Sequence, residues 1–125
     1  MEKRYLQLTD TTCYNSGFAF GNEIWNIVIG WDYFVKDTVG KQFVRAADSI
    51  SANIAEGFGR YHEKDKIKFY YYSLGSVKEC IDWCNKARVR GLISEDVYKV
   101  INAHLDRLPR EIHQLIKFTD EKLTV

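Results

Sequence analysis

Hydrophobic residues recur at the spacing of an α-helix along most of the chain. Over residues 11–32 they step alternately by four and three positions, through Cys13, Gly17, Phe20, Ile24, Ile27 and Trp31. Such a repeat places one apolar stripe along one side of a helix. Gly17, Gly21 and Gly30 each weaken a helix by ~1 kcal/mol relative to alanine, but the regular stripe still predicts a helix over residues 11–32. Residues 1–10 lack the pattern and are predicted to form an extended arm.

A second helix is predicted over residues 38–56, with Asp37 or Thr38 as its N-cap. Its apolar stripe consists of Phe43, Ala47, Ile50, Ile54 and Gly57. A stripe of small or polar residues runs beside it: Ala46, Ser49, Asn53 and Glu56. Small side chains there allow a neighbouring backbone to approach closely. The connection before this helix, residues 32–37, is rich in aromatic residues and is expected to be tucked against the protein.

Polar groups beside an apolar stripe need partners, because an unpaired buried amide or carboxylate costs a few kcal/mol. We therefore expect Asn53 and Glu56 to bind the adjoining loop or to pair with Arg45 or Arg60. Gly57 and Gly59 are expected to end the helix in the left-handed conformation that glycine adopts readily. A phosphate-binding loop is a poor alternative for these glycines, since no strand precedes them and no helix N-terminus with Lys and Ser or Thr follows.

The third predicted helix, residues 63–90, carries two apolar stripes. One is Ile67, Tyr70, Leu74, Val77, Ile81 and Cys84, and the other is Phe69, Ser73, Ser76, Cys80, Trp83 and Ala87. One stripe is enough for a helix of a monomeric bundle, so two indicate either a central position or a contact with another subunit. The candidate subunit-interface residues are Phe69, Ser73, Ser76, Cys80 and Trp83. Gly75 is expected to permit close approach of another helix.

A fourth helix is predicted over residues 94–122. Gly91 ends the helix before it, and Ser94 is the expected cap, followed by two acidic residues at the positive end of the helix dipole. The apolar stripe keeps its phase through Pro109, at Tyr98, Ile101, Leu105, Leu108, Ile112, Leu115 and Thr119. Because proline removes one backbone hydrogen bond and clashes with the preceding turn, the helix is predicted to bend at Pro109 and continue.

These four helices predict an all-α fold, an antiparallel up-down four-helix bundle that forms a single domain over residues 11–125. A chain of 125 residues is long enough for one core and too short for two. The sequence opens with no charged leader and contains no apolar run of 18 residues, which predicts a cytoplasmic protein with no membrane partner.

Residues 49–60, SISANIAEGFGR, resemble the central signature of the 23S rRNA intervening-sequence family of four-helix-bundle proteins. Arg45-Ala46-Ala47 and Leu74-Gly75-Ser76 match further family positions, and the resemblance extends from about Trp31 to the end of the chain. Two departures are a serine at position 51, where the family usually has proline, and Pro109 in a helix normally free of it. The resemblance implies that six residues are structural signature positions of the family: Arg45, Asn53, Glu56, Gly57, Gly59 and Gly75.

The same resemblance implies a bundle that commonly assembles as a five-fold ring. It also implies a relationship to an accessory protein of diversity-generating retroelements that binds nucleic acid. It implies no established enzymatic activity.

The net charge of +1 gives no overall attraction to nucleic acid, but the charge is unevenly distributed. Residues 41–93 hold 10 lysines and arginines against 6 acidic residues, whereas the rest of the chain holds 8 against 11. Two basic groups are candidate nucleic-acid contacts: Arg60, Lys64 and Lys68 near several tyrosines, and Lys86, Arg88 and Arg90. Basic residues mixed with aromatic rings can follow a phosphate backbone and stack on bases. The alternative is a solvated helix end, although five copies in a ring would add their weak contacts together.

The cysteines, histidines and other reactive side chains of the sequence predict no metal site, no cofactor and no catalytic site. Cys13, Cys80 and Cys84 form no C-x-x-C pair and are interpreted as buried thiols. The three histidines lie far apart, and no nucleophile–base set accompanies Asn53 or Glu56.

Two functions follow as hypotheses. The favoured one is a non-enzymatic homo-oligomeric scaffold, a pentameric ring, that binds RNA or DNA through a repeated basic surface. The alternative is a protein–protein interaction module with no nucleic-acid role. A hydrolase or nuclease is disfavoured, because the sequence contains no acidic cluster of the metal-ligand type.

Overall fold

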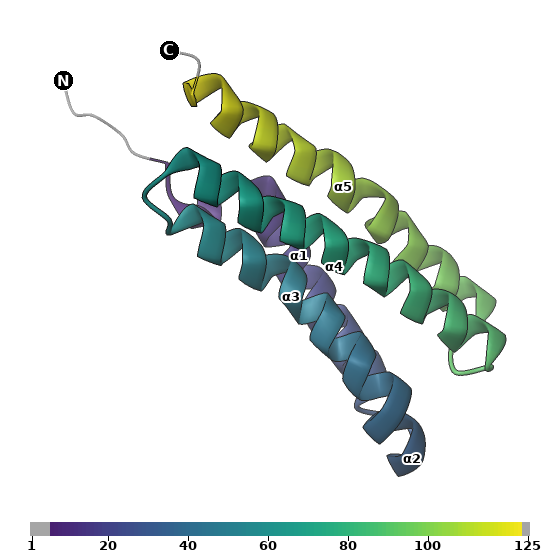
Figure 1. Cartoon of the computed structure of the whole chain (residues 1–125). Helices are drawn as coiled ribbons and strands as arrows, with labels where there is room; N and C mark the ends of the chain where they lie inside the picture. Colours follow the sequence, from purple (N-terminus) through teal and green to yellow (C-terminus); the bar gives the residue numbers. More distant parts are fainter. Residues whose placement is uncertain (1–5, 124–125) are drawn as a thin grey trace.

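Four long helices dominate the computed structural model, which describes residues 6–123 of the chain (Figure 1). They are α1 (Thr12–Val28), α3 (Lys41–Phe58), α4 (Glu63–Val89) and α5 (Glu95–Leu123). A 3-10 turn, η1 (Leu8–Asp10), precedes α1, while the short helix α2 (Tyr33–Val35) and a π-helical turn, η2 (Lys36–Gly40), precede α3. The described part of the chain contains no β-strand, so the all-α prediction is confirmed. Residues 1–5 of the predicted extended arm lie outside the described residues, and the prediction is wrong for residues 8–10, which form the turn η1.

Consecutive long helices run in opposite directions, as expected for an up-down bundle (Figure 1). α3 packs against α1 and α4, α4 also packs against α5, and a smaller contact between α1 and α5 closes the bundle. α1 and α4 are therefore the diagonal pair, with α4 at the front and α1 at the back in Figure 1. Towards the α2 end, the α1/α3 pair diverges from the α4/α5 pair.

The core is built from the predicted stripes of all four helices. Its largest fully buried side chains are Phe20, Ile24, Phe43, Ile50, Ile54, Tyr70, Val77, Ile101, Leu105, Leu108 and Ile112. The hydroxyl of Ser73 is buried with them and donates a hydrogen bond to the backbone oxygen of Ile50 at 2.8 Å. This bond joins α4 to α3 and satisfies a polar group that would otherwise destabilise the core.

Of the small-residue stripe of α3 only Ala46 is buried, and the close contacts of α3 come mainly from its apolar stripe. Ala46 and Ala47 are buried, and a β-carbon placed on Gly57 would lie 2.8 Å from Cε1 of Tyr70 and 2.9 Å from the backbone oxygen of Lys66. On the other side of α3, a β-carbon on Gly21 of α1 would lie 2.7 Å from a carboxylate oxygen of Asp48. Glycine thus lies at a close contact of α3 with each of its two neighbouring helices.

The left-handed helix end predicted at Gly57 and Gly59 is wrong. Gly57 lies within α3, and Gly59 has φ −79° and ψ −6°, in the right-handed region. The positive φ belongs to Gly91, at +71°, which ends α4. The Leu92 amide donates to the Ala87 carbonyl at 2.8 Å and the Gly91 amide to Arg88 at 3.1 Å, the two bonds of a Schellman motif.

The connection before α3 is shorter than predicted. α1 ends at Val28, and helical backbone resumes at Tyr33 and continues through α2 and η2 into α3. Thr38 therefore lies within the helical segment, where its hydroxyl donates to the Phe34 carbonyl at 2.7 Å, and neither it nor Asp37 is an N-cap. The aromatic pair Tyr33 and Phe34 is exposed and not tucked against the bundle.

The two apolar stripes of α4 are explained by contacts between helices of the same chain. Its buried residues come from both predicted stripes, because α4 lies between α3 and α5 and is covered on two sides: Tyr70, Ser73, Val77, Cys80, Cys84 and Ala87. Ser73 and Cys80 are fully buried and so do not belong to the candidate subunit interface. The close approach expected at Gly75 does not occur in the described residues, since nothing lies within 4 Å of a β-carbon placed there.

α5 continues through Pro109 without a break, as predicted. Leu105, Leu108 and Ile112 are buried on both sides of the proline, so the stripe keeps its phase. The predicted cap is present, because the Ser94 hydroxyl accepts a hydrogen bond from the Val97 amide at 3.1 Å. The bend at Pro109 stays a prediction.

Candidate nucleic-acid interface

The corner between α3 and α4 carries the first predicted basic group. α3 ends at Phe58 and α4 begins at Glu63, so Arg60 lies in the connection, while Lys64 and Lys68 lie one turn apart on α4. All three side chains are exposed. Together with Tyr61 they are called the basic corner below.

Aromatic rings accompany the cations of the basic corner. The guanidinium carbon of Arg60 lies 4.6 Å from the ring centroid of Phe69, and the Lys68 ammonium lies 5.9 Å from that of Tyr72. Phe69 and Tyr72 contact each other edge to face, with centroids 5.4 Å apart. Tyr61 is 89% exposed, and its ring contacts that of His62 edge to face, with centroids 5.1 Å apart.

The positive charge of the corner is partly offset. The Arg60 guanidinium pairs with the Glu56 carboxylate at 2.6 Å, an exposed contact between residues four apart. This pair confirms the partner predicted for Glu56, although Glu56 is exposed and not enclosed. The Asn53 side-chain amide instead donates to the Ser49 carbonyl of its own helix at 2.9 Å, and Arg45 is exposed.

The second basic group lies at the other end of α4, and acidic residues offset most of its charge. Lys86 pairs with Asp82 at 2.6 Å, and the Arg88 guanidinium donates two hydrogen bonds to Glu95, at 2.7 and 3.1 Å. The bonds from Arg88 lower the pKa of Glu95 below its ordinary value. At ~1.5 Å per residue the 27-residue α4 is roughly 40 Å long, so the structure does not bring Lys86, Arg88 and Arg90 together with the basic corner.

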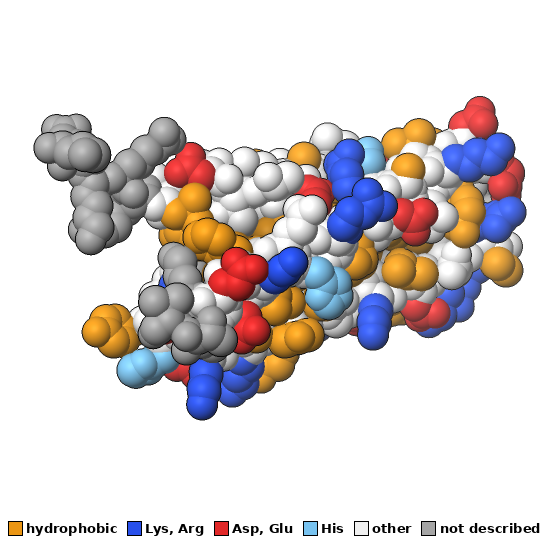
Figure 2. Space-filling view, turned by 90° about the horizontal axis from the view of Figure 1, so that it is seen from above, with side chains coloured by type: hydrophobic (Ala, Val, Ile, Leu, Met, Phe, Trp, Pro, Cys, Tyr) orange, Lys and Arg blue, Asp and Glu red, His pale blue; other side chains and the backbone are white. Residues whose placement is uncertain are grey.

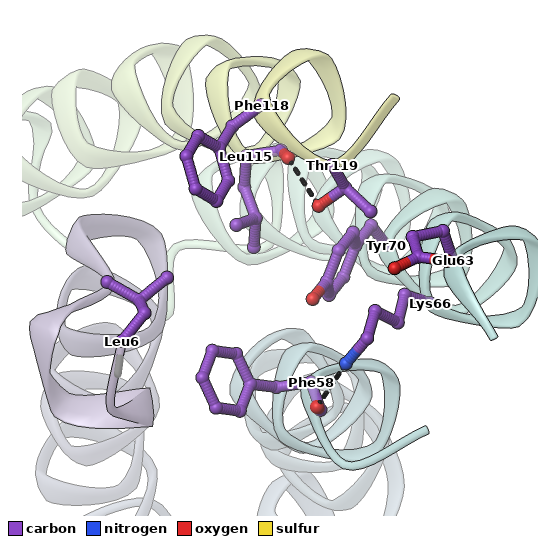
Figure 3. A pocket seen from close by; sticks show the side chains of 8 residues that line it. All are labelled: Leu6, Phe58, Glu63, Lys66, Tyr70, Leu115, Phe118 and Thr119. Carbon is purple, nitrogen blue, oxygen red and sulfur yellow. Dashed lines mark hydrogen bonds between the residues drawn. The ribbon is translucent and has the colours of Figure 1, made fainter. Parts of the chain in front are cut away.

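A cavity of about 260 Å³ opens at the end of the bundle where α3 meets α4 (Figure 3). Phe58, Leu115 and Phe118 form its apolar wall, and the Tyr70 ring projects into it. Lys66 donates to the Phe58 carbonyl at the end of α3 at 2.6 Å, and the Thr119 hydroxyl donates to the Leu115 carbonyl of its own helix at 2.9 Å. Burial raises the pKa of Tyr70 to about 12, which keeps its hydroxyl neutral. This cavity could not be predicted from the sequence, because Tyr70 and Thr119 lie on apolar stripes.

A buried carboxylate joins α1 to α5. Glu111 is 8% exposed and accepts a hydrogen bond from the Ser16 hydroxyl at 2.9 Å. Its other oxygen lies 3.3 Å from Nε of Arg107, an ion pair without hydrogen-bond geometry. Nearby, burial and then the Glu111 charge raise the pKa of Cys13 to about 12. The burial of Glu111 and its bond to Ser16 could not be predicted from the sequence, because the two residues lie 95 positions apart.

The thiols are buried, as predicted. Burial raises the pKa of Cys84 to about 11, and it also raises that of Cys80. A protonated, inaccessible thiol is a poor nucleophile and a poor metal ligand. No group of three or more His, Cys, Asp or Glu residues within the described range is arranged to hold a metal ion. Of the histidines, His104 pairs with Glu23 of α1 at 2.8 Å.

The fold and the surface together define a small all-α bundle protein whose exposed cations cluster with aromatic rings at one corner. The chain belongs to the 23S rRNA-intervening sequence protein family, whose model matches residues 9–114. It is also similar to the crystal structure of a protein with unknown function from the S23 ribosomal protein family of Bacteroides thetaiotaomicron. That similarity has a TM-score of 0.76 and 22% sequence identity, and it covers 85% of this chain and 99% of the other. No curated protein matches the chain in sequence.

Family membership confirms the resemblance carried by residues 49–60, and the structural similarity supports the fold. No described helix combines the length and the apolar character needed to cross a bilayer.

Proposed function

We propose that the protein is a non-enzymatic, homo-oligomeric scaffold of the cytoplasm, a five-subunit ring, that binds RNA or DNA through its basic corner. The observation that carries the proposal is the cluster of exposed cations and aromatic rings at this corner: Arg60 lies over Phe69, Lys68 lies over Tyr72, and the exposed Tyr61 follows Arg60 in the sequence. Lysine and arginine bind phosphates, and an aromatic ring stacks on a base of any sequence. Nothing in the chain resembles a base-reading motif, so binding is expected to be tolerant of sequence.

Oligomerisation is part of the proposal because one basic corner is weak. Glu56 offsets Arg60, and Asp65 lies between Lys64 and Lys68 in the sequence. On the face of the molecule shown in Figure 2, basic and acidic side chains are interspersed, and no broad basic surface appears there. Several copies held together would contact several phosphates of one strand at once, which raises the overall affinity without any new contact.

A second candidate function is a protein–protein interaction module. The observation that favours it is the surface of α1, which exposes Phe18 and Trp25 while Glu23 is the only charged residue of that helix. Surfaces depleted in charge and enriched in aromatic residues are typical of protein interfaces.

Binding of fluorescently labelled single-stranded RNA and DNA across a salt series distinguishes the two functions. If the basic corner binds phosphates, affinity should fall steeply with salt, with a logarithmic slope of about −0.7 per phosphate contact on a single strand. Changing Arg60, Lys64 and Lys68 together to Gln should weaken binding and flatten that slope.

The matched control changes Lys86, Arg88 and Arg90 to Gln, which removes the same charge from the other end of α4. Because Lys86 and Arg88 are already paired with acidic residues, this variant should lose less affinity. Equal losses in the two variants would contradict the assignment to the basic corner. If the wild-type protein binds neither RNA nor DNA at low salt, the nucleic-acid function is excluded and the protein–protein interaction module is favoured.

A further inference from the structure

An apolar hollow of about 240 Å³ lies between the end of α1 and the segment that leads into α3, towards the α2 end of the molecule (Figure 1). Its apolar wall consists of Trp25, Val28, Ile29, Gly40 and Val44, and the other two lining residues are Lys36 and Lys41. An apolar concavity with a few polar groups is typical of small-molecule sites. The basic corner lies at the other end of α3, so the hollow is a separate feature.

The backbone shapes the floor of the hollow. η2 is a π-helical turn, and such turns occur frequently at functional sites. It ends at Gly40, where an added β-carbon would lie 2.6 Å from Cγ1 of Val28. The glycine therefore allows η2 to approach α1 closely. Lys36 and Lys41 come from the η2 and α3 side of the hollow, whereas Trp25 and Val28 come from the α1 side.

Both lysines have donors available for an anion. Nζ of Lys36 lies 3.4 Å from the Ile29 carbonyl oxygen, a long hydrogen bond that holds the ammonium at the hollow and uses one of its three donors. Lys41 is exposed, and its ammonium makes no hydrogen bond or ion pair with the described residues. Two positive charges thus lie beside an apolar wall.

The charges around the hollow leave it positive. None of its lining residues is acidic. Asp32 and Asp37 are the nearest acidic residues in sequence, and neither forms an ion pair with the two lysines in the described part of the chain. Glu23, the only charged residue of α1, pairs with His104 of α5. The C-terminal end of the α1 dipole contributes roughly half a negative charge, which is less than the charge of two lysines.

We propose that the hollow binds a small aromatic carboxylate, with its ring against Trp25 and Val44 and its carboxylate between Lys36 and Lys41. A cavity of roughly 150 Å³ holds benzene, so about 240 Å³ is enough for a ring with a short side chain. An aromatic ring stacks on the indole of Trp25, and the carboxylate accepts charge-assisted hydrogen bonds from the ammonium groups. A phosphate of nucleic acid lacks the apolar body that fills this hollow, so the ligand differs from that of the basic corner.

Isothermal titration calorimetry of the full chain with 3-phenylpropionate tests the proposal. Two probes of similar shape are the controls: 3-phenylpropan-1-ol, which is neutral, and 3-phenylpropylamine, which is a cation at neutral pH. The carboxylate should bind once per chain and ~10-fold more tightly than the alcohol, as expected for two exposed ion pairs. The amine should bind more weakly than either, because the lysines repel it.

Two variants locate the bound carboxylate. Lys36→Gln and Lys41→Gln should each weaken the binding of 3-phenylpropionate ~3-fold, and the double variant should weaken it ~10-fold. The affinity for the alcohol should not change, because the apolar wall is intact. Lys99→Gln is the matched control, since Lys99 is an exposed lysine of α5 and does not line the hollow, and this variant should bind as the wild type does. All three sites are exposed, so the helical circular-dichroism signal should be retained.

Equal affinities for the carboxylate and the alcohol would overturn the proposal, because the lysines would then play no part. Lysine variants that bind 3-phenylpropionate as tightly as the wild type would also overturn it, since the ligand would lie elsewhere. So would a wild type that does not bind 3-phenylpropionate up to its solubility limit. In that case, binding to vesicles of phosphatidylserine and phosphatidylcholine would assign the lysines to a lipid surface. An affinity that falls as the protein concentration rises would identify a second copy of the chain as the occupant and contradict the proposal.

Discussion

Two glycines of this protein have opposite surroundings. Gly57 is buried where α3 crosses α4, and an added β-carbon there would meet the Tyr70 ring and a backbone oxygen. Gly75 lies on the outside of α4 with open space around it. The same substitution should therefore have opposite effects on the stability of the folded chain.

Gly75→Ala should raise the free energy of unfolding by ~1 kcal/mol, because alanine is the better helix former and nothing opposes its methyl group. Gly57→Ala should lower it by roughly 1–3 kcal/mol, the cost of forcing a methyl group into a packed helix crossing. Urea unfolding of the wild type and of each variant would measure both effects. Stabilisation by both substitutions would contradict the close approach at Gly57.

Buried titratable groups predict a loss of stability at high pH. Burial raises the pKa of Cys13 from its ordinary value of 9.0 to about 12 and that of Tyr70 from 10.0 to about 12. The folded state keeps protons that the unfolded state releases. This stabilisation is complete below pH 9 and is lost as the pH rises from 9 towards 12, by up to ~1.4 kcal/mol per pH unit for each group.

Urea unfolding between pH 8 and pH 11 would measure this loss. The Cys13→Ala variant lacks one of the titrating groups, so its free energy of unfolding should fall less steeply over the same interval. An equal slope in the variant and the wild type would contradict the assignment to Cys13.

Among the elements, α3 is the helix that packs most closely against its two neighbours, α1 and α4. Ala46 and Ala47 are buried on it, and it contacts both α1 and α4. Ala47→Leu should lower the free energy of unfolding by roughly 1–3 kcal/mol, because the added methylene groups have no space between closely packed helices. The same type of change at exposed Lys99 of α5 should have little effect. Thermal or urea unfolding would compare them, and equal stabilities would contradict the close packing of α3.

The helical elements were largely predictable because their apolar stripes have the period of a helix. The prediction was wrong before α3, where exposed Tyr33 and Phe34 looked like a buried loop. Val35 and Val39, one turn apart and followed by Phe43, continue the α3 stripe into η2. That continuation was present in the sequence and shows that the helical period is more reliable than aromatic content.

The candidate site was predictable only in part. The two basic groups and the aromatic residues beside them were visible in the sequence, because neighbours on a helix recur three and four positions apart. The Glu95 carboxylate offsets the positive charge of Arg88. The two side chains meet because the tight turn at Gly91 folds α5 back against α4. The pairs Ser16–Glu111 and Glu23–His104 depend on the packing of α1 against α5, which no local pattern encodes.

At the scale of the whole molecule, the α1/α3 pair and the α4/α5 pair diverge towards the α2 end (Figure 1). The basic corner lies at the opposite end, where α3 passes into α4. The exposed side chains of Trp25, Ile29 and Tyr33 lie towards the α2 end. The exposed cations with their aromatic rings and these apolar side chains therefore lie at different ends of the molecule.

The central claim is that several copies of this chain assemble into one particle that binds nucleic acid. Light scattering coupled to size exclusion, with and without a labelled single-stranded RNA at low salt, tests it most directly. The account predicts a particle of five 14.6 kDa chains that elutes together with the RNA and loses it as the salt concentration rises. A particle of one chain, eluting separately from the RNA at low salt, would contradict the account.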